Sequence, residues 1–264
     1  MTKVYDSECN EVEDIQLPPL FSTPYRPDVI KRAVLSERSA KRQPYGADPL
    51  SGKRTSAHYH GKRKYRWAMM NKEMSRMPRI HGKVGSLHFT ARFAPQAVKG
   101  RQAHPPKAEK IWLEKINNKE RSLAIRSALA AAASLDIVTG RGHKTQISPI
   151  IFAGSMEDIG KTKDVLKILA KLIPNELERC AVKKVRAGKG KMRGRQYRKK
   201  KGPLVIVSKE CGLSKAARNI AGVDVSTAGS MTVEALAPGT HAGRLMIITK
   251  PAIQKIDEIY GETA

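Results

Sequence analysis

Hydrophobic residues in this chain form short compact runs and longer runs with helical spacing, and the two kinds alternate over most of its length. The compact runs, typical of buried strands, are Asp136–Val138, Pro149–Ala153, Pro203–Ser208, Val223–Thr227 and Arg244–Thr249, with shorter ones at Lys3–Tyr5 and Ala181–Val185. The helical segments are Arg26–Arg42, Asn118–Leu135, Lys161–Ile173, Ser214–Gly222 and Lys250–Tyr260, with a turn or short helix at Thr232–Leu236. Strands that alternate with helices predict right-handed crossovers and a mostly parallel sheet. We therefore predict an α/β domain of three layers, in which helices cover both faces of the sheet.

Local signals refine some of these elements. In the first helix Pro27 suits the first turn, and Leu35 is expected on the core-facing side. Asn118 is placed to cap the alanine-rich helix, whose packing face is expected to include Leu123. Between the first strand and the first helix, the acidic segment Glu8–Asp14 is expected to be an exposed loop.

The alternating pattern stops between Lys41 and Lys107. Pro and Gly recur throughout this segment, and neither a helical nor a strand period persists in it. Loops of this length are uncommon inside compact domains, and those that occur are usually functional or disordered. We predict that residues 41–107 form a long irregular basic extension without a core of its own, inserted in an α/β domain made of residues 1–40 and 108–264.

The distribution of charge indicates what the extension binds. The formal net charge of the chain is +26, and residues 41–107 carry 16 Lys and Arg against two acids, Asp48 and Glu73. Residues 183–201 carry another 11 Lys and Arg and no acid, so the rest of the chain is nearly neutral. An enzyme with a generally basic surface would spread its charge more evenly. The expected partner is therefore a large anionic polymer.

Aromatic side chains accompany the cations of the extension. They are Tyr45, Tyr59, Tyr65, Trp67, Phe89 and Phe93. This mixture suits binding to phosphates and stacking on bases, whereas a plain linker carries Ser, Glu and Gly without Trp or Phe. We predict an RNA-binding extension that its partner orders, with a disordered basic tail of lower specificity as the alternative.

The second basic run contains glycines at Gly188, Gly190 and Gly194, which superficially resemble a dinucleotide-binding turn. Such a turn opens a helix, whereas this run is too basic to start a helix and leads into a strand. Glycines among cations let the backbone lie close to phosphates, and Tyr197 is suited to stacking. RNA contact is the preferred interpretation, and a solvated basic loop is the alternative.

The chain shows no pattern typical of a catalytic or metal site. Cys9, Cys180 and Cys211 lie far apart without a CxxC pair, which favours free thiols in a reducing cytoplasm. The pair His58 and His60 has no Cys or carboxylate cluster nearby, and no HExxH, GxSxG or P-loop motif is present. We predict no metal, no cofactor and no enzymatic activity.

Three further polar residues are expected to have structural roles, and the chain is expected to be intracellular. His143 and His241 are interpreted as turn residues, and Asp224 as a buried, hydrogen-bonded acid. No apolar run reaches the length of a membrane span, and the acidic N-terminal segment is unlike a signal peptide. We therefore expect a soluble protein without a membrane partner.

Several strings carry a resemblance to a known family. They are RPDVIKRAVLSERSAKRQPYGADPLSGKR at 26–54, PQAVKGRQAHPPKAEK at 95–110, NKERSLAIRSALAAAA at 118–133, KGKMRGRQYR at 189–198 and SKAARNIAGVDVSTAG at 214–229. They occur in the same order and span almost the whole chain. On these strings the chain resembles the family of the large-ribosomal-subunit protein numbered four, in its archaeal and eukaryotic branch, and its archaeal members most of all.

The resemblance implies a structural and assembly protein of the large ribosomal subunit, in the cytoplasm. Its α/β domain would lie on the subunit surface, and its loop would thread into large-subunit rRNA, with a tip at the wall of the polypeptide exit tunnel. Neighbouring ribosomal proteins and the nascent peptide would be further partners. A free RNA-binding regulator of its own messenger and an RNA-modifying enzyme are the alternative functions.

Composition and resemblance together indicate the residues that would contact RNA. In the extension these are Lys53, Arg54, Arg63, Lys64, Arg66, Trp67, Arg76, Arg79, Lys83, Arg92, Gln96, Lys99, Arg101, His104 and Lys107. In the second run they are Lys189, Lys191, Arg193, Arg195, Tyr197, Arg198 and Lys199. The expected tunnel-facing tip is Ile80, His81, Leu87, His88 and Phe89, where this chain departs from the Gly-, Arg- and Gln-rich tip common in the family.

Overall fold

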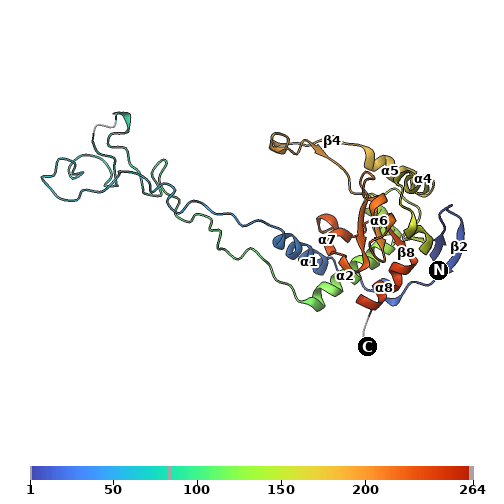
Figure 1. The fold of residues 1–264 in the computed structure, drawn as a ribbon. Helices are drawn as coiled ribbons and strands as arrows, with labels where there is room; N and C mark the ends of the chain where they lie inside the picture. Colours follow the sequence, from blue (N-terminus) through green and yellow to red (C-terminus); the bar gives the residue numbers. More distant parts are fainter. Residues whose placement is uncertain (1, 83–84, 262–264) are drawn as a thin grey trace. The chain divides into compact units, whose positions relative to one another are not determined.

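The computed structural model of this chain describes residues 2–82 and 85–261. It divides into two compact units (Figure 1). Residues 1–41 and 113–264 form the globular unit, and residues 42–112 form the basic unit. Among the described helices, none is long and apolar enough to cross a membrane.

A mixed six-stranded sheet lies at the centre of the described part of the globular unit, in the order β2-β1-β3-β8-β6-β7. Its parallel strands are β1 (Thr2–Tyr5), β3 (Ile150–Phe152), β6 (Leu204–Val207), β7 (Asp224–Thr227) and β8 (Met246–Thr249). The remaining strand, β2 (Glu11–Ile15), pairs antiparallel with β1. The predicted α/β class is confirmed.

Strand β2 corrects the prediction that the acidic segment Glu8–Asp14 is an exposed loop. Lys3 Nζ lies 2.5 Å from Glu11 Oε2, and Lys250 Nζ lies 2.5 Å from Glu13 Oε1, so two lysines offset the acidic charge. The side chains of β2 are mostly exposed, and charge on an edge strand discourages pairing with another chain. Residues 11–14 therefore form a strand with mostly exposed side chains, while residues 8–10 lie outside it.

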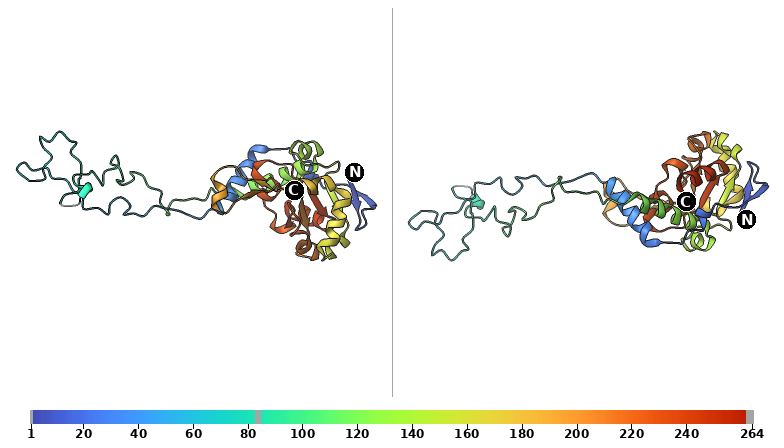
Figure 2. Two further views of the ribbon diagram at one scale, coloured as in Figure 1. Left: turned by 90° about the horizontal axis from the view of Figure 1, so that it is seen from above. Right: turned by 90° about the horizontal axis from the view of Figure 1, so that it is seen from below.

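Alternate residues of the strands enter two hydrophobic clusters on opposite faces of the sheet. Figure 2 shows helices on both sides of the strands. One cluster takes Leu204 and Ile206 together with α1 (Pro27–Ala40), α2 (Asn118–Ala133), α7 (Val233–Leu236) and α8 (Lys250–Tyr260). The other takes Val205 and Val207 together with α3 (Leu135–Gly140), α4 (Thr162–Leu172) and α6 (Gly212–Ala217). Both faces of β6 are therefore buried, which explains its uninterrupted apolar sequence.

The alanine-rich helix α2 packs through most of its alanines, as predicted, but not through Leu123. Its cap position is Asn117 rather than Asn118, and Asn117 makes no side-chain capping bond. Ala128 and Leu129 are fully buried, whereas Leu123 is 36% exposed. Similarly, Leu35 of α1 lies on the exposed side of its helix. Alanines permit close helix packing, so the buried face follows the small residues rather than every large apolar one.

One predicted strand is helical, and another is only partly a strand. The run Asp136–Val138 lies in α3, where Thr139 Oγ1 donates to the carbonyl of Leu135 at 3.0 Å. The run Ala181–Val185 is divided between the end of α5 (Pro174–Ala181) and the two-residue strand β4 (Lys184–Val185). Short apolar runs have no period that separates a strand from a buried helical turn, so the sequence pattern does not determine the conformation of these two runs.

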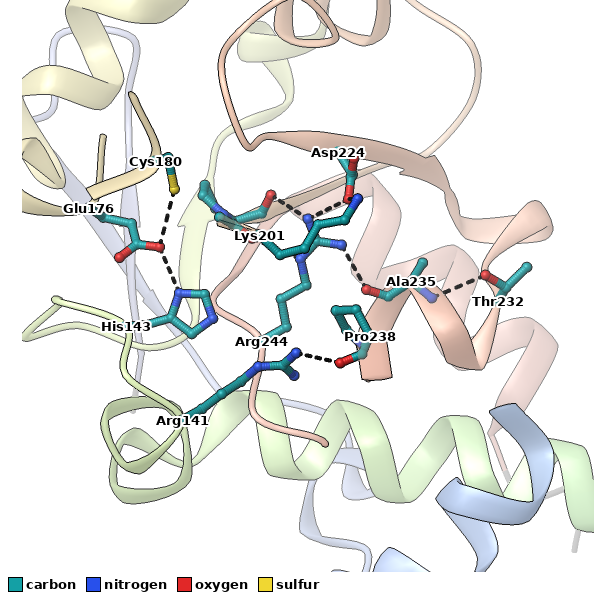
Figure 3. A network of polar contacts seen from close by, with 12 residues as sticks. Arg141, His143, Glu176, Cys180, Lys201, Asp224, Thr232, Ala235, Pro238 and Arg244 are labelled. Carbon is teal, nitrogen blue, oxygen red and sulfur yellow. Dashed lines mark hydrogen bonds and ion pairs between the residues drawn. The ribbon is translucent and has the colours of Figure 1, made fainter. Parts of the chain in front are cut away.

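A network of buried polar side chains links α5 to the strands (Figure 3). Glu176 has no exposed side-chain surface, and its carboxylate lies 2.7 Å from His143 Nδ1 and accepts a bond from Arg179 Nε at 2.8 Å. Burial by itself raises the pKa of Glu176, but the bonds from His143, Arg179 and the Lys144 amide outweigh burial and lower that pKa to about 2. His143 is therefore a buried partner of Glu176, which corrects its interpretation as a turn residue.

The same network includes Arg244, which is 1% exposed. Its Nε donates to the Gly202 carbonyl at 2.8 Å, its Nη1 to the Ala235 carbonyl at 2.9 Å and its Nη2 to Asp224 Oδ2 at 2.7 Å. Asp224, which also accepts from Lys201 Nζ at 2.8 Å, is hydrogen-bonded as predicted but only partly buried. These bonds hold the chain where the second basic run ends.

We expect Leu129→Ala to lower the free energy of unfolding of the globular unit by about 2–5 kcal/mol, because it leaves a cavity in a fully buried part of α2. Leu123→Ala is the matched control on the same helix and should cost less than about 1 kcal/mol. Urea unfolding followed by circular dichroism measures both. Equal losses would contradict the assigned buried face.

We expect the globular unit to lose stability as the pH falls from 4.5 toward about 2. Glu176 binds a proton less readily in the folded state than in the unfolded chain. Its contribution to the stability of the fold is therefore complete at a pH above the pKa of the unfolded state and is lost at a pH below the pKa of the folded state. Glu176→Gln should unfold more easily at neutral pH and show a weaker pH dependence in this window. Glu178→Gln, at an exposed position on the same helix, is the control, and urea unfolding at a series of pH values is the measurement.

Candidate nucleic-acid interface

The second basic run, residues 183–201, forms a small hairpin on the globular unit, here called the basic hairpin (Figure 1). Strand β4 pairs antiparallel with β5 (Tyr197–Arg198), and the 3₁₀ helix η4 (Lys189–Arg193) lies between them. Gly188 and Gly194 have φ values of +78° and +73°, which favour glycine over other residues. The chain therefore returns on itself without opening an α-helix, so the geometry of a dinucleotide-binding turn is absent from this run.

The cations of the basic hairpin point outward. Every residue predicted to contact RNA here is exposed: Lys189, Lys191, Arg193, Arg195, Tyr197, Arg198 and Lys199. Arg186 differs, because its Nε donates to the Arg195 carbonyl at 3.1 Å and so holds the two sides of the hairpin together. With no acid in residues 183–201, the exposed charge is not neutralised within the run. The hairpin therefore presents a concentrated positive surface around one exposed aromatic ring.

The basic unit consists of two arms, residues 42–57 and 93–112, and a head, residues 58–92. The arms contact each other through their backbones, because the Ala47 amide donates to the Pro106 carbonyl at 2.8 Å. Gly52 has a φ of +73°, and a Cβ atom added there would lie 2.6 Å from the carbonyl oxygen of Gly100. Only glycine permits this close approach of the two arms.

The predicted RNA contacts on the arms are largely available at the surface. Lys53, Arg54, Gln96, Lys99, His104 and Lys107 are exposed, and Arg101 is partly exposed. Arg54 forms an ion pair with Asp48. The other charges of this group therefore lie along two neighbouring backbones, in the arrangement that a phosphate backbone contacts.

The head has a small core, which corrects the prediction that the extension has none. The side chains of Ala68, Met69 and Ile80 are buried. Backbone bridges join His58 to Arg79 and Arg79 to Ala91. The head also contains partly buried rings in contact with one another, with the Trp67 ring centroid 5.6 Å from that of His81 and 5.7 Å from that of Phe89. Contacts between rings at such distances stabilise a fold without any periodic pattern.

Two of the predicted RNA-binding arginines make bonds within the head or to the neighbouring arm. Arg79 donates to the carbonyls of Phe89 and Ser75, each at 2.9 Å, and Arg92 donates to the carbonyl of Val98 at 3.0 Å. Arg79 and Arg92 therefore fix the local backbone. The remaining cations predicted in the head, Arg63, Lys64, Arg66 and Arg76, are exposed, and Lys83 lies outside the described residues.

The residues predicted for the tip differ in exposure. Ile80 is 6% exposed and belongs to the small core, and His81 and Phe89 are partly buried. Leu87 and His88 are exposed. Trp67 is partly buried and carries the Arg66 guanidinium over its ring, 4.8 Å from the centroid. A partner would therefore meet Leu87, His88 and the Arg66–Trp67 pair directly.

His58 and His60, predicted to lack ligand partners, are joined in the head by His81. One ring nitrogen from each lies within 4.8 Å of the others. Burial lowers the pKa of His81, so its ring is neutral near pH 7. The only sequence signal for this cluster was the spacing of His58 and His60, because nothing near His81 in the sequence indicates that it lies beside them.

The carboxyl ends of β6 and β8, where ligands of many α/β proteins bind, are occupied by a side chain of the protein itself. The Glu157 carboxylate accepts bonds from the Ser208 amide at 2.8 Å, from Ser208 Oγ at 2.7 Å and from Thr249 Oγ1 at 2.6 Å. Burial raises the pKa of Glu157, but these bonds outweigh it and hold the pKa below its ordinary value. Glu157 thus binds the strand ends together.

Comparison with known proteins agrees with this geometry. The model of the ribosomal protein L4/L1 family matches residues 15–259. The large ribosomal subunit protein uL4 of Nanoarchaeum equitans is 48% identical over 260 residues, which cover 97% of this chain and 97% of that protein. The proteins of the same name from Methanosphaera stadtmanae and Methanococcus vannielii are 44% and 45% identical, each over 97% of this chain and over 96% and 98% of their own lengths. This chain therefore belongs to the ribosomal protein L4/L1 family.

Proposed function

We propose that this chain is a structural component of the large ribosomal subunit that binds large-subunit rRNA through the basic unit and the basic hairpin. The observation that carries this proposal is the separation of charge. Two acid-poor segments hold nearly all of the net charge of +26, and most of their cations are exposed. The relatives bear the name of a large-subunit ribosomal protein over nearly their whole length.

In this proposal the two units have different tasks. The globular unit is a three-layer α/β domain on the subunit surface, and the basic unit is a long loop that enters the rRNA. Its cations neutralise phosphates that would otherwise repel one another, and each contact releases counterions. Ordering the arms costs roughly 1–2 kcal/mol per residue in backbone entropy, which the RNA contacts must offset. The protein therefore supports subunit assembly.

The head reaches the polypeptide exit tunnel in the same proposal. Leu87 and His88 are exposed and are the residues we assign to contact with the nascent peptide, whereas Ile80 supports them from the core of the head. Neighbouring large-subunit proteins and the rRNA are the other partners. The protein acts in the cytoplasm and without a catalytic step, since Glu157 fills the position where an α/β enzyme would bind its substrate.

We expect the tagged chain, sedimented from a native cell extract through a high-salt sucrose gradient, to remain with the large subunit. A protein whose phosphate contacts are buried in a folded ribonucleoprotein resists removal by salt better than a protein bound only at the surface. A chain that runs free of the subunit would favour the alternative of an RNA-binding regulator. An unrelated basic protein added to the extract controls for nonspecific retention.

We expect the triple variant Lys189→Ala, Lys191→Ala and Arg193→Ala to bind large-subunit rRNA more weakly and with less salt dependence. Each lost phosphate contact should lower the slope of log K against log salt by about 0.7–0.9. The matched control is the triple variant Lys161→Ala, Lys163→Ala and Lys167→Ala, which removes the same charge from exposed positions in and beside α4. Filter binding at several salt concentrations distinguishes the two, and equal slopes would mean that only net charge matters.

A further inference from the structure

Three histidine rings meet in the head of the basic unit. The ring centroids of His58 and His60 are 4.2 Å apart, and that of His81 lies 4.6 Å from each of them. The spacing of His58 and His60 puts both on one side of an extended backbone, and the bridge between His58 and Arg79 brings His81 beside them. We call His58, His60 and His81 the histidine cluster.

Backbone carbonyls orient two of these rings. His58 Nδ1 lies 3.0 Å from the Ser56 carbonyl oxygen, and His81 Nε2 lies 3.2 Å from the His58 carbonyl oxygen. A carbonyl only accepts, so the proton of each neutral ring belongs on the nitrogen that faces the carbonyl. The opposite nitrogens, Nε2 of His58 and Nδ1 of His81, then carry free lone pairs. This is the arrangement in which a second hydrogen bond orients a metal-binding histidine.

Two nitrogens of the cluster are buried and lack hydrogen-bond partners in the described structure. They are Nε2 of His60 and Nδ1 of His81. A buried polar atom without a partner costs free energy, and such atoms in a protein call for an explanation. Nδ1 of His81 is also the nitrogen that keeps a free lone pair when Nε2 of the same ring donates to the His58 carbonyl. Ring nitrogens from three histidines that lie within 4.8 Å of one another, two nitrogens of the cluster being buried without a partner, can bind a metal ion.

We propose that Nε2 of His58, Nε2 of His60 and Nδ1 of His81 bind one Zn²⁺ ion. Neutral imidazoles suit zinc, whereas Mg²⁺ and Ca²⁺ prefer oxygen ligands. With Zn–N bonds of about 2.1 Å, tetrahedral ligand nitrogens lie roughly 3.4 Å apart, so nitrogens that already lie within 4.8 Å of one another need move only a little as the ion binds. Water completes the coordination in the free protein.

Zinc at this position connects parts of the head that are distant in sequence. His58 and His81 are 23 residues apart, and the segment between them contains Trp67 and the exposed cations Arg63, Lys64 and Arg66. Closing this loop removes conformational freedom from the unbound chain, so metal binding and ordering of the head are coupled. The surrounding cations lower the local affinity for a dication, but at physiological salt their effect is screened beyond about 8 Å.

The test uses the untagged full chain, stripped with a chelator and kept free of RNA. We expect it to bind one equivalent of Co²⁺ with the visible absorption of a four-coordinate ion, and Zn²⁺ to displace the Co²⁺. His58→Ala, His60→Ala and His81→Ala should each weaken binding by at least about tenfold. His104→Ala replaces an exposed histidine on an arm of the same unit and should leave the affinity unchanged.

A second measurement guards against variants that fail to fold. Zn²⁺ should increase amide hydrogen-exchange protection of residues 58–81 in the wild-type chain and in His104→Ala, but not in the three cluster variants. The unfolding midpoint of the globular unit should be the same in all of them. Binding weaker than about 0.1 mM, or binding that survives replacement of all three histidines, would overturn the proposal. Because the titration contains no RNA, its failure would leave the ribosomal function standing, and loss of the chain from the large subunit would leave the zinc site standing.

Discussion

Repulsion between like charges is the constraint on which the rest of this structure depends. With 50 Lys and Arg against 24 Asp and Glu, the chain cannot bury its cations, and a uniform distribution would work against a compact core. Most of the excess is instead placed in two segments with very few acids, while the remainder keeps an ordinary balance. The globular unit can then fold around its sheet, and the two basic segments retain their charge for an anionic partner.

Attachment of the basic hairpin to a neutral domain depends on the buried Arg244 and on a few charges that are less buried. Arg244 bonds to the Gly202 carbonyl and to Asp224, and Lys201 bonds to Asp224 as well. Arg179, which is held by Glu176, donates to the Lys201 carbonyl at 2.7 Å. A flexible hairpin would lose entropy on binding RNA, so a fixed base reduces the ordering cost of each phosphate contact. The buried network thus serves the surface segment beside it.

The head of the basic unit has few aliphatic residues from which to form a core. Aromatic and imidazole rings supplement the buried Met69 and Ile80, and the rings of Trp67, His81 and Phe89 are in mutual contact. Flat rings bury large areas at a low entropic cost and can also stack on bases at their exposed faces. In the proposed function the same composition serves folding and RNA recognition, and for that reason it is not recognisable as a core from sequence.

Sequence alone determined the α/β class, the segregation of charge and most elements of strong local pattern. The strands near Pro149, Pro203 and Arg244 and the helix Lys250–Tyr260 follow from apolar runs and end signals that act over a few residues. The sequence also predicted that the cations of the basic hairpin are exposed, because charged side chains without acidic partners are rarely buried. Tertiary structure decided the strand conformation of the acidic β2, the helical state of Asp136–Val138, and the inward bonds of Arg79 and Arg92. It also decided that His143 meets Glu176 and that His81 joins His58 and His60, because contacts between residues distant along the chain depend on how the whole backbone closes and leave no local periodicity.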